Sequence, residues 1–217
     1  MKLDKNSYGT ILAVWVVYAL LFLGVCLLTD LTWVRILVGA ILFVAAFLCT
    51  IFFRVPERSG PGNGQIITSV ADGEIVLVDK SFEQEFLKRE CIRISVYMDF
   101  FDVHANFWPV SGEVIYCNYH PGRHKLAFLP KSSELNEHAT TVIRSEAGPE
   151  ILFKQIAGSF ARRVVSYAKI GLPVKAGEQC GIIKLGSRID YFLPATAKIM
   201  VEEGQRVRAV ETIIAEL

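Results

Sequence analysis

Two long segments without a single charged residue constrain this chain more than any other feature. They are TILAVWVVYALLFLGVCLL, residues 10–28, and ILVGAILFVAAFLCTIFF, residues 36–53. Each approaches the roughly 20 apolar residues that a helix needs to cross the hydrocarbon of a bilayer. The link between them, TDLTWVR, is very short. The sequence therefore predicts a transmembrane helical hairpin that anchors residues 1–54 in a membrane.

Basic residues on both sides of the hairpin predict its orientation. Lys2 and Lys5 precede the first segment, and Arg54 and Arg58 follow the second. The positive-inside bias places both ends of the hairpin, and the domain that follows, on the cytoplasmic face of the cell membrane. A cleaved signal peptide is disfavoured, because a second apolar segment follows at once and no A-x-A-like site is present. A hairpin that enters one leaflet without crossing the bilayer remains an alternative.

Charge and cysteine content exclude several classes of partner. The formal net charge is +1, so we expect no nucleic-acid partner. The five cysteines, at positions 26, 49, 91, 117 and 180, form no C-x-x-C pair. A disulfide framework or a cysteine-based zinc site is therefore disfavoured, and no metal is expected.

The remainder of the chain has the pattern of a β-dominant domain. Residues 55–65 are rich in Pro, Gly and polar residues, which indicates a linker. The domain expected over residues 66–217 contains short β-branched runs, among them GEIVLVDKSF, CIRISVYM, GEVIYCNYH and TTVIRSE. No sustained helical period follows Phe53.

The C-terminal quarter contains a weak internal repeat. YAKIGLPVKAGEQCGIIKL and TAKIMVEEGQRVRAVETIIAEL share an AKI run, a turn with Gly, a V-x-A element and an Ile-rich strand. This pattern resembles the hammerhead sandwich of biotinyl and lipoyl carrier domains. Carriers present a Lys at the exposed bend, whereas this chain has LGSR there, which makes Ser187 the presented residue.

The bond between Gly186 and Ser187 has one specific chemical use. A serine hydroxyl can attack the preceding carbonyl and convert the amide to an ester, and Gly leaves that carbonyl open. The hydroxyl needs a base, for which His104 in its apolar surroundings is a candidate, and Asp72 could orient the imidazole. Each feature alone has an ordinary reading: a Gly-Ser turn, a core histidine and an Asp-Gly turn.

Six segments in order resemble the phosphatidylserine decarboxylase proenzymes, in their short form with a membrane hairpin. They are FFRVPERSGP, SVADGEIV, FFDVHANFWPVSGEV, YHPGRHKLAFLPKSSELNEH, QIAGSFARRVVSYAKIG and LGSRIDYFLP, which together extend over most of residues 52–194.

The resemblance implies self-cleavage between residues 186 and 187. Ser187 would attack Gly186, with His104 as base and Asp72 orienting it. The products would be a β fragment, 1–186, and an α fragment, 187–217, that form a heterodimer, with higher oligomers left open. Ser187 would become a pyruvoyl cofactor that accepts the amine of a membrane phospholipid substrate, phosphatidylserine. The implied product is phosphatidylethanolamine, with release of CO2, in membrane phospholipid synthesis.

Two departures from the family pattern concern possible binding residues. Phe107 stands where longer members have a second His, so their division of labour between two histidines does not transfer. His138 stands where an Arg is usual. We expect His138 and Arg188 to bind the substrate. We expect His120 and His124 to be exposed histidines in a loop. Further candidate cations for the substrate phosphate are Arg54, Arg58, Arg162 and Arg163.

Two other functions compete with a decarboxylase. A membrane-tethered hammerhead carrier or adaptor without catalysis would explain the hairpin and the repeat, but not Asp72, His104 or QIAGSFARR. A serine hydrolase is disfavoured, because the chain has neither a G-x-S-x-G elbow nor an α/β alternation. A denaturing gel distinguishes the decarboxylase from the adaptor, because only the self-processing enzyme yields a short C-terminal piece.

Overall fold

The computed structural model describes residues 2–61, 64–122, 136–158, 163–184 and 187–217. The chain divides into two compact units, Met1–Glu57 and Arg58–Leu217. Gly186, Arg162 and His124 lie outside the described residues.

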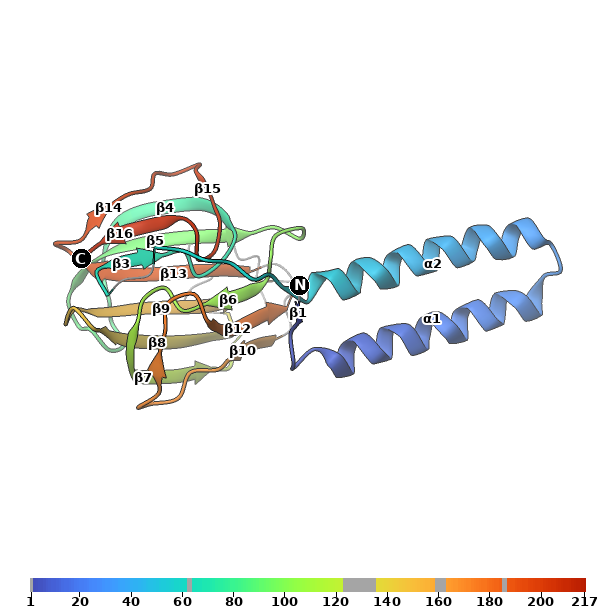
Figure 1. Ribbon diagram of the computed structural model, residues 1–217, viewed down its shortest axis with the longest axis horizontal. Helices are drawn as coiled ribbons and strands as arrows, with labels where there is room; N and C mark the ends of the chain where they lie inside the picture. The colour runs from blue at the N-terminus through green and yellow to red at the C-terminus, as the bar shows by residue number, and fades with distance from the viewer. Residues whose placement is uncertain (1, 62–63, 123–135, 159–162, 185–186) are drawn as a thin grey trace. The chain divides into compact units, whose positions relative to one another are not determined.

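The first unit is a helical hairpin, drawn in blue in Figure 1. Helix α1 spans Tyr8–Leu28 and α2 spans Thr32–Phe52. Both are long and apolar enough to cross a membrane, with mean hydropathies of 2.8 and 2.5. A short antiparallel pair, β1 (Lys2–Leu3) and β2 (Arg54–Val55), joins the two ends of the hairpin. The two apolar helices predicted from sequence are confirmed.

A few specific contacts hold the two helices together. The indole nitrogen of Trp15 donates to the hydroxyl of Thr50 at 3.0 Å. At the far end, Arg35 donates to the carbonyl oxygens of Thr29 at 2.6 Å and Cys26 at 2.8 Å, which satisfies carbonyls at the end of α1. The sequence TDLTWVR thus makes a tight, capped turn.

The second unit is built almost entirely of β-strands, and its described part contains no helix. The predicted β-dominant domain is confirmed. The strands are β3 Ile66–Thr68, β4 Gly73–Phe82, β5 Glu90–Met98, β6 Ala105–Phe107, β7 Gly112–His120, β8 His138–Ser145, β9 Glu150–Ala157, β10 Arg163–Ser166, β11 Pro173–Val174, β12 Gln179–Lys184, β13 Ser187–Pro194, β14 Lys198–Ile199, β15 Arg206–Val207 and β16 Ile213–Glu216.

The strands form one large sheet and two small ones. The large sheet has the order β11-β7-β8-β9-β13-β5-β4-β15, and the small sheets have the orders β10-β12-β6 and β14-β16-β3. Every pair is antiparallel. In Figure 1 the long strands β4, β5, β13, β9, β8 and β7 follow one another across this unit. The sequence predicted several of these strands but not their order.

One apolar core lies between the large sheet and the two small sheets. It contains Ile94, Phe153 and Tyr191 from the large sheet, Ile67 and Ala215 from one small sheet, and Ile183 from the other. All six residues are fully buried. Because alternate residues of a strand face opposite sides, this core occupies one face of the large sheet and leaves the other face for different contacts.

The four C-terminal strands, β13 to β16, are divided between the large sheet and one small sheet. Strand β13 lies inside the large sheet between β5 and β9, while β15 lies at its edge beside β4. Strands β14 and β16 join β3 in a small sheet. The hammerhead description of this segment stays a prediction, because most of these strands pair with strands from earlier in the chain.

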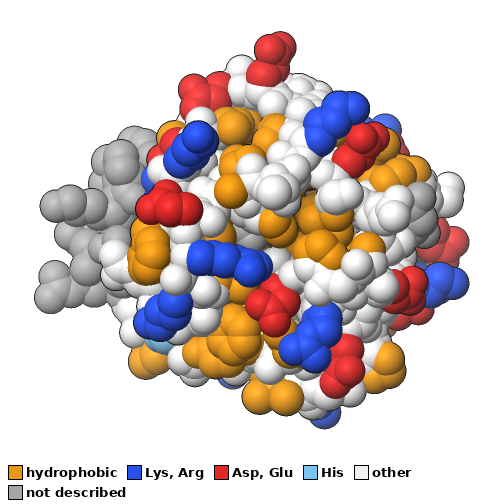
Figure 2. Space-filling view, turned by 90° about the vertical axis from the view of Figure 1, so that its left-hand side faces the viewer, with side chains coloured by type: hydrophobic (Ala, Val, Ile, Leu, Met, Phe, Trp, Pro, Cys, Tyr) orange, Lys and Arg blue, Asp and Glu red, His pale blue; other side chains and the backbone are white. Residues whose placement is uncertain are grey.

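The surface displayed in Figure 2 mixes residue types. Acidic and basic side chains alternate there with apolar ones, rather than gathering into a large patch of one charge. This distribution agrees with the formal net charge of +1.

Candidate active site around Ser187

Ser187 is the first residue of β13 and is fully buried. It pairs in register with Met98 of β5 on one side and with Ala157 of β9 on the other. Its hydroxyl oxygen has no hydrogen-bond partner among the described residues. A buried hydroxyl without a partner costs about 1–3 kcal/mol, so such groups are rare and call for a functional explanation.

The strands before and after the Gly186–Ser187 bond belong to different sheets. Strand β12, which ends at Lys184, pairs with β10 and β6, whereas β13 pairs with β5 and β9. In the described residues, the two strands on either side of the LGSR stretch pair with other strands rather than with each other.

A pair of buried amide side chains lies beside Ser187. Asn106 accepts a hydrogen bond from Gln155 at 2.8 Å, and its amide nitrogen lies 3.9 Å from the sulfur of Met98, the register partner of Ser187. Asn106 and Gln155 are both fully buried. Gly181 permits this arrangement, because a Cβ there would lie only 2.7 Å from the amide nitrogen of Gln155.

His104 lies immediately before β6 and is fully buried. Its carbonyl oxygen accepts the N–H of Ile183 at 3.2 Å, which ties it to the strand leading to Ser187. Its ring nitrogen Nδ1 is 3.0 Å from the carbonyl oxygen of Asp102. A carbonyl oxygen can only accept, so the proton is on Nδ1 and the lone pair is on Nε2. In that tautomer Nε2 can take up a proton.

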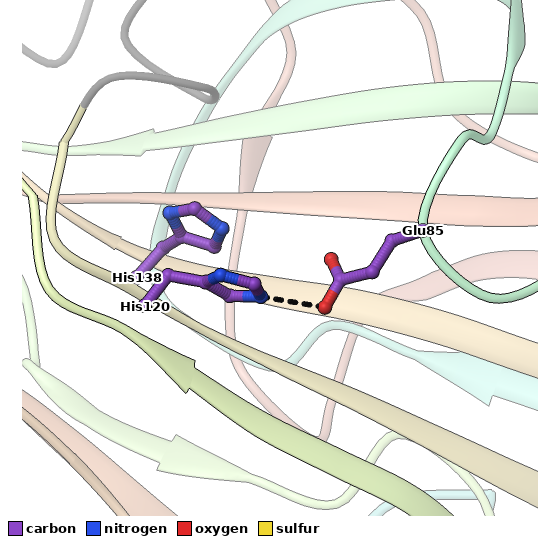
Figure 3. Close-up of side chains that lie close together, drawn as sticks. All are labelled: Glu85, His120 and His138. Carbon is purple, nitrogen blue, oxygen red and sulfur yellow. Dashed lines mark hydrogen bonds and ion pairs between the residues drawn. The ribbon is translucent and has the colours of Figure 1, made fainter.

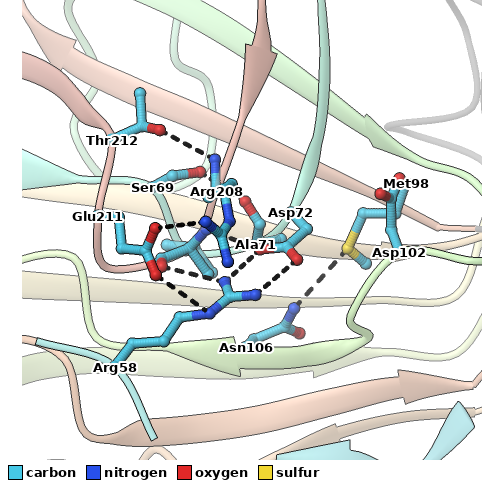
Figure 4. A network of polar contacts seen from close by, with 12 residues as sticks. Arg58, Ser69, Ala71, Asp72, Met98, Asp102, Asn106, Arg208, Glu211 and Thr212 are labelled. Atoms are coloured by element: carbon cyan, nitrogen blue, oxygen red, sulfur yellow. Dashed lines mark hydrogen bonds and ion pairs between the residues drawn. The ribbon is translucent and has the colours of Figure 1, made fainter. Parts of the chain in front are cut away.

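Asp72 is bound by Arg58, which the sequence suggested only as a candidate cation for the substrate phosphate. Its carboxylate pairs with Arg58, with 2.8 Å between Oδ2 and Nη2, and also accepts the N–H of Ala209 at 2.8 Å (Figure 4). The hydrogen bond to Asp72 raises the pKa of Arg58. Among its described hydrogen bonds, Asp72 contacts Arg58 and Ala209 rather than His104.

The backbone beside Asp72 is nevertheless joined to the segment that carries His104. The carbonyl oxygen of Val70 accepts the N–H of Phe107 at 2.9 Å, and the N–H of Thr68 donates to the carbonyl oxygen of Pro109 at 2.9 Å. The turn itself depends on Gly73, because a Cβ there would lie 2.2 Å from the carbonyl oxygen of Tyr97. Asp72 thus anchors a turn that supports the His104 segment.

A second carboxylate, Asp102, lies within this segment. It accepts the N–H of Asp99 at 2.9 Å and a hydrogen bond from Arg206 at 2.6 Å. Burial raises the pKa of Asp102, against the lowering effect of the hydrogen bond from Asp99. These contacts fix the backbone whose carbonyl oxygen holds the His104 ring.

The two residues predicted to bind substrate, Arg188 and His138, lie on the other face of the large sheet from the Ser187 side chain. Arg188 forms a buried ion pair with Asp190, with 2.8 Å between Nε and Oδ1. His138 pairs with Ile156, which in turn pairs with Arg188, so the three residues share one face of the large sheet. Ser187, which precedes Arg188 in the same strand, faces the opposite side.

The face of the large sheet that carries Arg188 and His138 contains a second polar cluster, composed of Glu85, His120 and His138 (Figure 3). Burial alone would raise the pKa of Glu85, but hydrogen bonds from His120, Lys154 and Thr140 outweigh it and lower the pKa to about 2. Burial lowers the pKa of His138, although its hydrogen bond to Asn136 opposes this. His120 ends β7, so its expected place in an exposed loop is wrong.

Several of these residues were missed from sequence for an identifiable reason. Asn106 follows His104 by two positions and could have been found from that spacing, because residues i and i+2 share a face of an extended chain. The sequence named Arg58 and the motif that begins at Gln155, but it gave no signal that Arg58 would contact Asp72 or that Gln155 would contact Asn106, because these partners are far apart in the chain.

Comparison with known proteins shows the family of this chain. Residues 45–215 match the family model described as phosphatidylserine decarboxylase. The Amoebophilus asiaticus protein named phosphatidylserine decarboxylase proenzyme is 45% identical, over 76% of this chain and 74% of that protein. The Parabacteroides distasonis protein of the same name is 38% identical, over 100% of this chain and 99% of that protein. The Porphyromonas gingivalis protein of that name is 37% identical over the same shares. The chain therefore belongs to the phosphatidylserine decarboxylase family of enzymes.

Proposed function

We propose that this chain is a self-processing decarboxylase that converts phosphatidylserine to phosphatidylethanolamine and CO2 in membrane phospholipid synthesis. The observation that carries the proposal is the buried Ser187 hydroxyl, which has no hydrogen-bond partner among the described residues. The relatives named above support self-processing, because they are named as proenzymes.

Self-processing requires a nucleophile and a base. In the proposal, Nε2 of His104 takes the proton of the Ser187 hydroxyl as its oxygen attacks the carbonyl carbon of Gly186. The amide becomes an ester, and elimination then breaks the bond between the ester oxygen and Cβ of Ser187. Gly186 leaves as a carboxylate, and hydration of the resulting dehydroalanine gives the pyruvoyl group and ammonia. The tautomer set by the Asp102 carbonyl oxygen supports His104 as the base.

Asp72 is proposed as a positioning residue for this step. The sequence predicted that it orients His104, and the described contacts support an indirect route to the same end. Arg58 holds the Asp72 carboxylate, and the adjoining backbone holds the chain beyond His104 through Val70 and Phe107. Loss of Asp72 would release this turn and misplace the imidazole.

The two products of cleavage are proposed to remain together as a heterodimer. The α fragment, 187–217, contributes β13 to the interior of the large sheet, β15 to its edge and β16 to a small sheet. Each of these strands pairs with a strand of the β fragment, 1–186. Cleavage would therefore leave the fold intact while creating a new chain end inside the domain.

The buried position of Ser187 suits a pyruvoyl group made from it. Such a group supplies an electrophilic carbonyl that accepts the substrate amine and takes up electrons as CO2 leaves. Around it, the apolar core side chains exclude water, and Asn106 and Gln155 supply polar groups that can orient the head group.

The helical hairpin is proposed to hold the enzyme in the membrane that contains its lipid substrate. The flanking lysines and arginines place the catalytic domain on the cytoplasmic face. A protease site inserted at residues 59–61 tests this orientation: sealed spheroplasts should protect it until they are permeabilised, and cleavage from outside the intact membrane would contradict it.

Turnover of a labelled substrate tests the proposed activity. The full chain in detergent micelles with carboxyl-labelled phosphatidylserine should release labelled CO2 and form phosphatidylethanolamine in equal amounts. Hydroxylamine, which reacts with carbonyl groups, should abolish both. A processed chain that releases no CO2, or whose activity survives hydroxylamine, would disprove the proposed chemistry.

A further inference from the structure

We propose that Glu85, His120 and His138 form a binding site for a divalent transition-metal ion of the Zn²⁺ type, on the sheet face opposite Ser187. One potential ligand atom from each of the three side chains lies within 4.8 Å of the others. In Figure 3 the His120 ring lies between His138 and Glu85. The site is separate from the proposed decarboxylase chemistry.

Two adjacent strands hold the histidines. His120 ends β7 and His138 begins β8, and the two residues are register partners. Their rings stack with 4.4 Å between centroids. Nδ1 of His138 lies 2.8 Å from the carbonyl oxygen of Asn136, so this nitrogen carries the proton and Nε2 keeps a lone pair. Metal-bound histidines commonly make this contact to a backbone carbonyl through their other ring nitrogen.

A well-ordered turn holds the carboxylate. Glu85 lies between β4 and β5, in a turn built around the buried Glu83. The Glu83 carboxylate accepts the N–H groups of Glu85, Phe86 and Leu87 at 2.9, 2.8 and 2.7 Å. On Glu85 itself, Oε2 accepts hydrogen bonds from Thr140 at 2.8 Å and Lys154 at 2.9 Å. This arrangement directs Oε1 toward His120, 2.6 Å from its Nε2.

The local charge favours a cation. Among the described side chains that line the cavity, Lys154 is the basic residue that contacts Glu85, at 2.9 Å, and its ammonium also lies 3.7 Å from the carboxylate of Glu83. The other basic group of the cavity, Arg93, is paired with Asp79 at 2.6 Å. Among the described residues, the two carboxylates of Glu83 and Glu85 therefore share the single ammonium of Lys154. With neutral imidazoles the cluster has a net charge of about −1, which a divalent ion would reverse.

The donor set and the space around it indicate the class of ion. Two imidazole nitrogens and one carboxylate oxygen suit Zn²⁺ and neighbouring transition metals, whereas Mg²⁺ and Ca²⁺ prefer oxygen ligands alone. Ligand atoms of a tetrahedral Zn²⁺ lie about 3.3 Å apart, so a small rotation of the partly exposed His120 would open its contact with Glu85 and admit the ion. The cluster lines a cavity of about 360 Å³, which leaves room for a water molecule as fourth ligand.

One of the three proposed ligands stands at a position where this chain departs from the pattern of its family. His138 stands where the family pattern described above has an arginine. Since His120 and Glu85 are both already directed toward position 138, that one difference completes the three-ligand set. A bound ion would tie the β4–β5 turn to the paired strands β7 and β8.

Metal titration of the full chain in detergent tests the proposal. After treatment with EDTA and its removal, the wild type should bind about one equivalent of Zn²⁺ in the micromolar range, measured by calorimetry. Co²⁺ should give the visible absorption bands of a tetrahedral site. At a Zn²⁺ concentration 100 times the Kd, the melting temperature should rise by about 5–10 °C.

Substitutions locate the site. Glu85→Gln and His138→Gln should weaken Zn²⁺ binding at least about tenfold, as loss of a ligand does. Glu113→Gln, an exposed carboxylate-to-amide change on β7, is the matched control and should bind as the wild type does. If His138→Gln fails to fold, judged by its melting in EDTA, His120→Gln takes its place. Absence of saturable binding in the wild type, or unchanged binding in these ligand variants, would overturn the proposal.

Discussion

Ser187 and Arg188 are neighbours in β13, yet their side chains lie on opposite faces of the large sheet. Ser187 is on the side of the apolar core with Met98, whereas Arg188 is paired with Asp190 on the other side. The position of Arg188 next to the proposed cleavage site therefore does not bring its guanidinium beside the Ser187 side chain.

The first prediction is that Arg188 acts mainly on stability. Both members of the Arg188–Asp190 pair are buried, so Arg188→Met would leave a buried carboxylate and should cost about 3–5 kcal/mol. The double variant Arg188→Met/Asp190→Leu should recover much of that loss. Thermal unfolding of the full chain in detergent measures both. Equal destabilisation in the single and double variants would contradict the assignment of Arg188 to a structural ion pair.

The second prediction concerns the base. His104→Ala should leave the precursor uncleaved, because no other group would take the proton of Ser187. His104→Gln should behave in the same way, since an amide keeps a similar volume but is not basic. Denaturing gels of freshly expressed protein would show the result, with Glu113→Gln as a control that should be processed normally. Normal cleavage in His104→Ala would transfer the base role to another group.

The third prediction tests the indirect route from Asp72. Asp72→Ala should slow self-cleavage by about 10–100-fold without abolishing it, because the imidazole keeps its own contact with Asp102. Arg58→Gln should have a similar effect, and the double variant should be little worse than either single one. A time course of precursor loss measures the three rates. Additive losses would show that Arg58 and Asp72 act separately.

The fourth prediction follows from the lowered pKa of Glu85, which is about 2 in the fold against an ordinary value of 4.5. A carboxylate with a depressed pKa in the folded state stabilises the fold above its unfolded pKa and loses that contribution as the pH falls. In EDTA, the wild type should exceed Glu85→Gln in stability by about 2–3 kcal/mol at pH 6. That difference should shrink steadily from pH 5 to pH 3, as followed by thermal melts. A difference independent of pH over this range would contradict the pairing of a charged Glu85.

The sequence predicted the local features of this fold well. The charge-free segments 10–28 and 36–53 correspond to α1 and α2, and GEIVLVDKSF is the whole of β4. These features depend on local composition and alternation, which the sequence displays directly. The side chains of Ser187 and Arg188 point to opposite faces of the sheet because successive side chains alternate along a strand, which follows once both residues are placed in one strand.

The remaining features depend on contacts between residues far apart in the sequence. The Arg58–Asp72 pair, the Asn106–Gln155 pair and the cluster of Glu85 with two histidines form only when the domain is folded and its three sheets are assembled. Antiparallel strands give no sequence signal that fixes which of them become neighbours over such separations. The placement of β12 and β13 in different sheets is of the same kind.

The mass of the smaller chain tests the central claim most directly. Purified wild-type protein should give two chains under denaturing conditions, and intact mass spectrometry of the smaller should match residues 187–217 with the N-terminal amine replaced by a ketone. Ser187→Ala should give one intact chain of 217 residues without decarboxylase activity. A wild-type protein that decarboxylates phosphatidylserine while wholly uncut, or an active Ser187→Ala variant, would contradict the account.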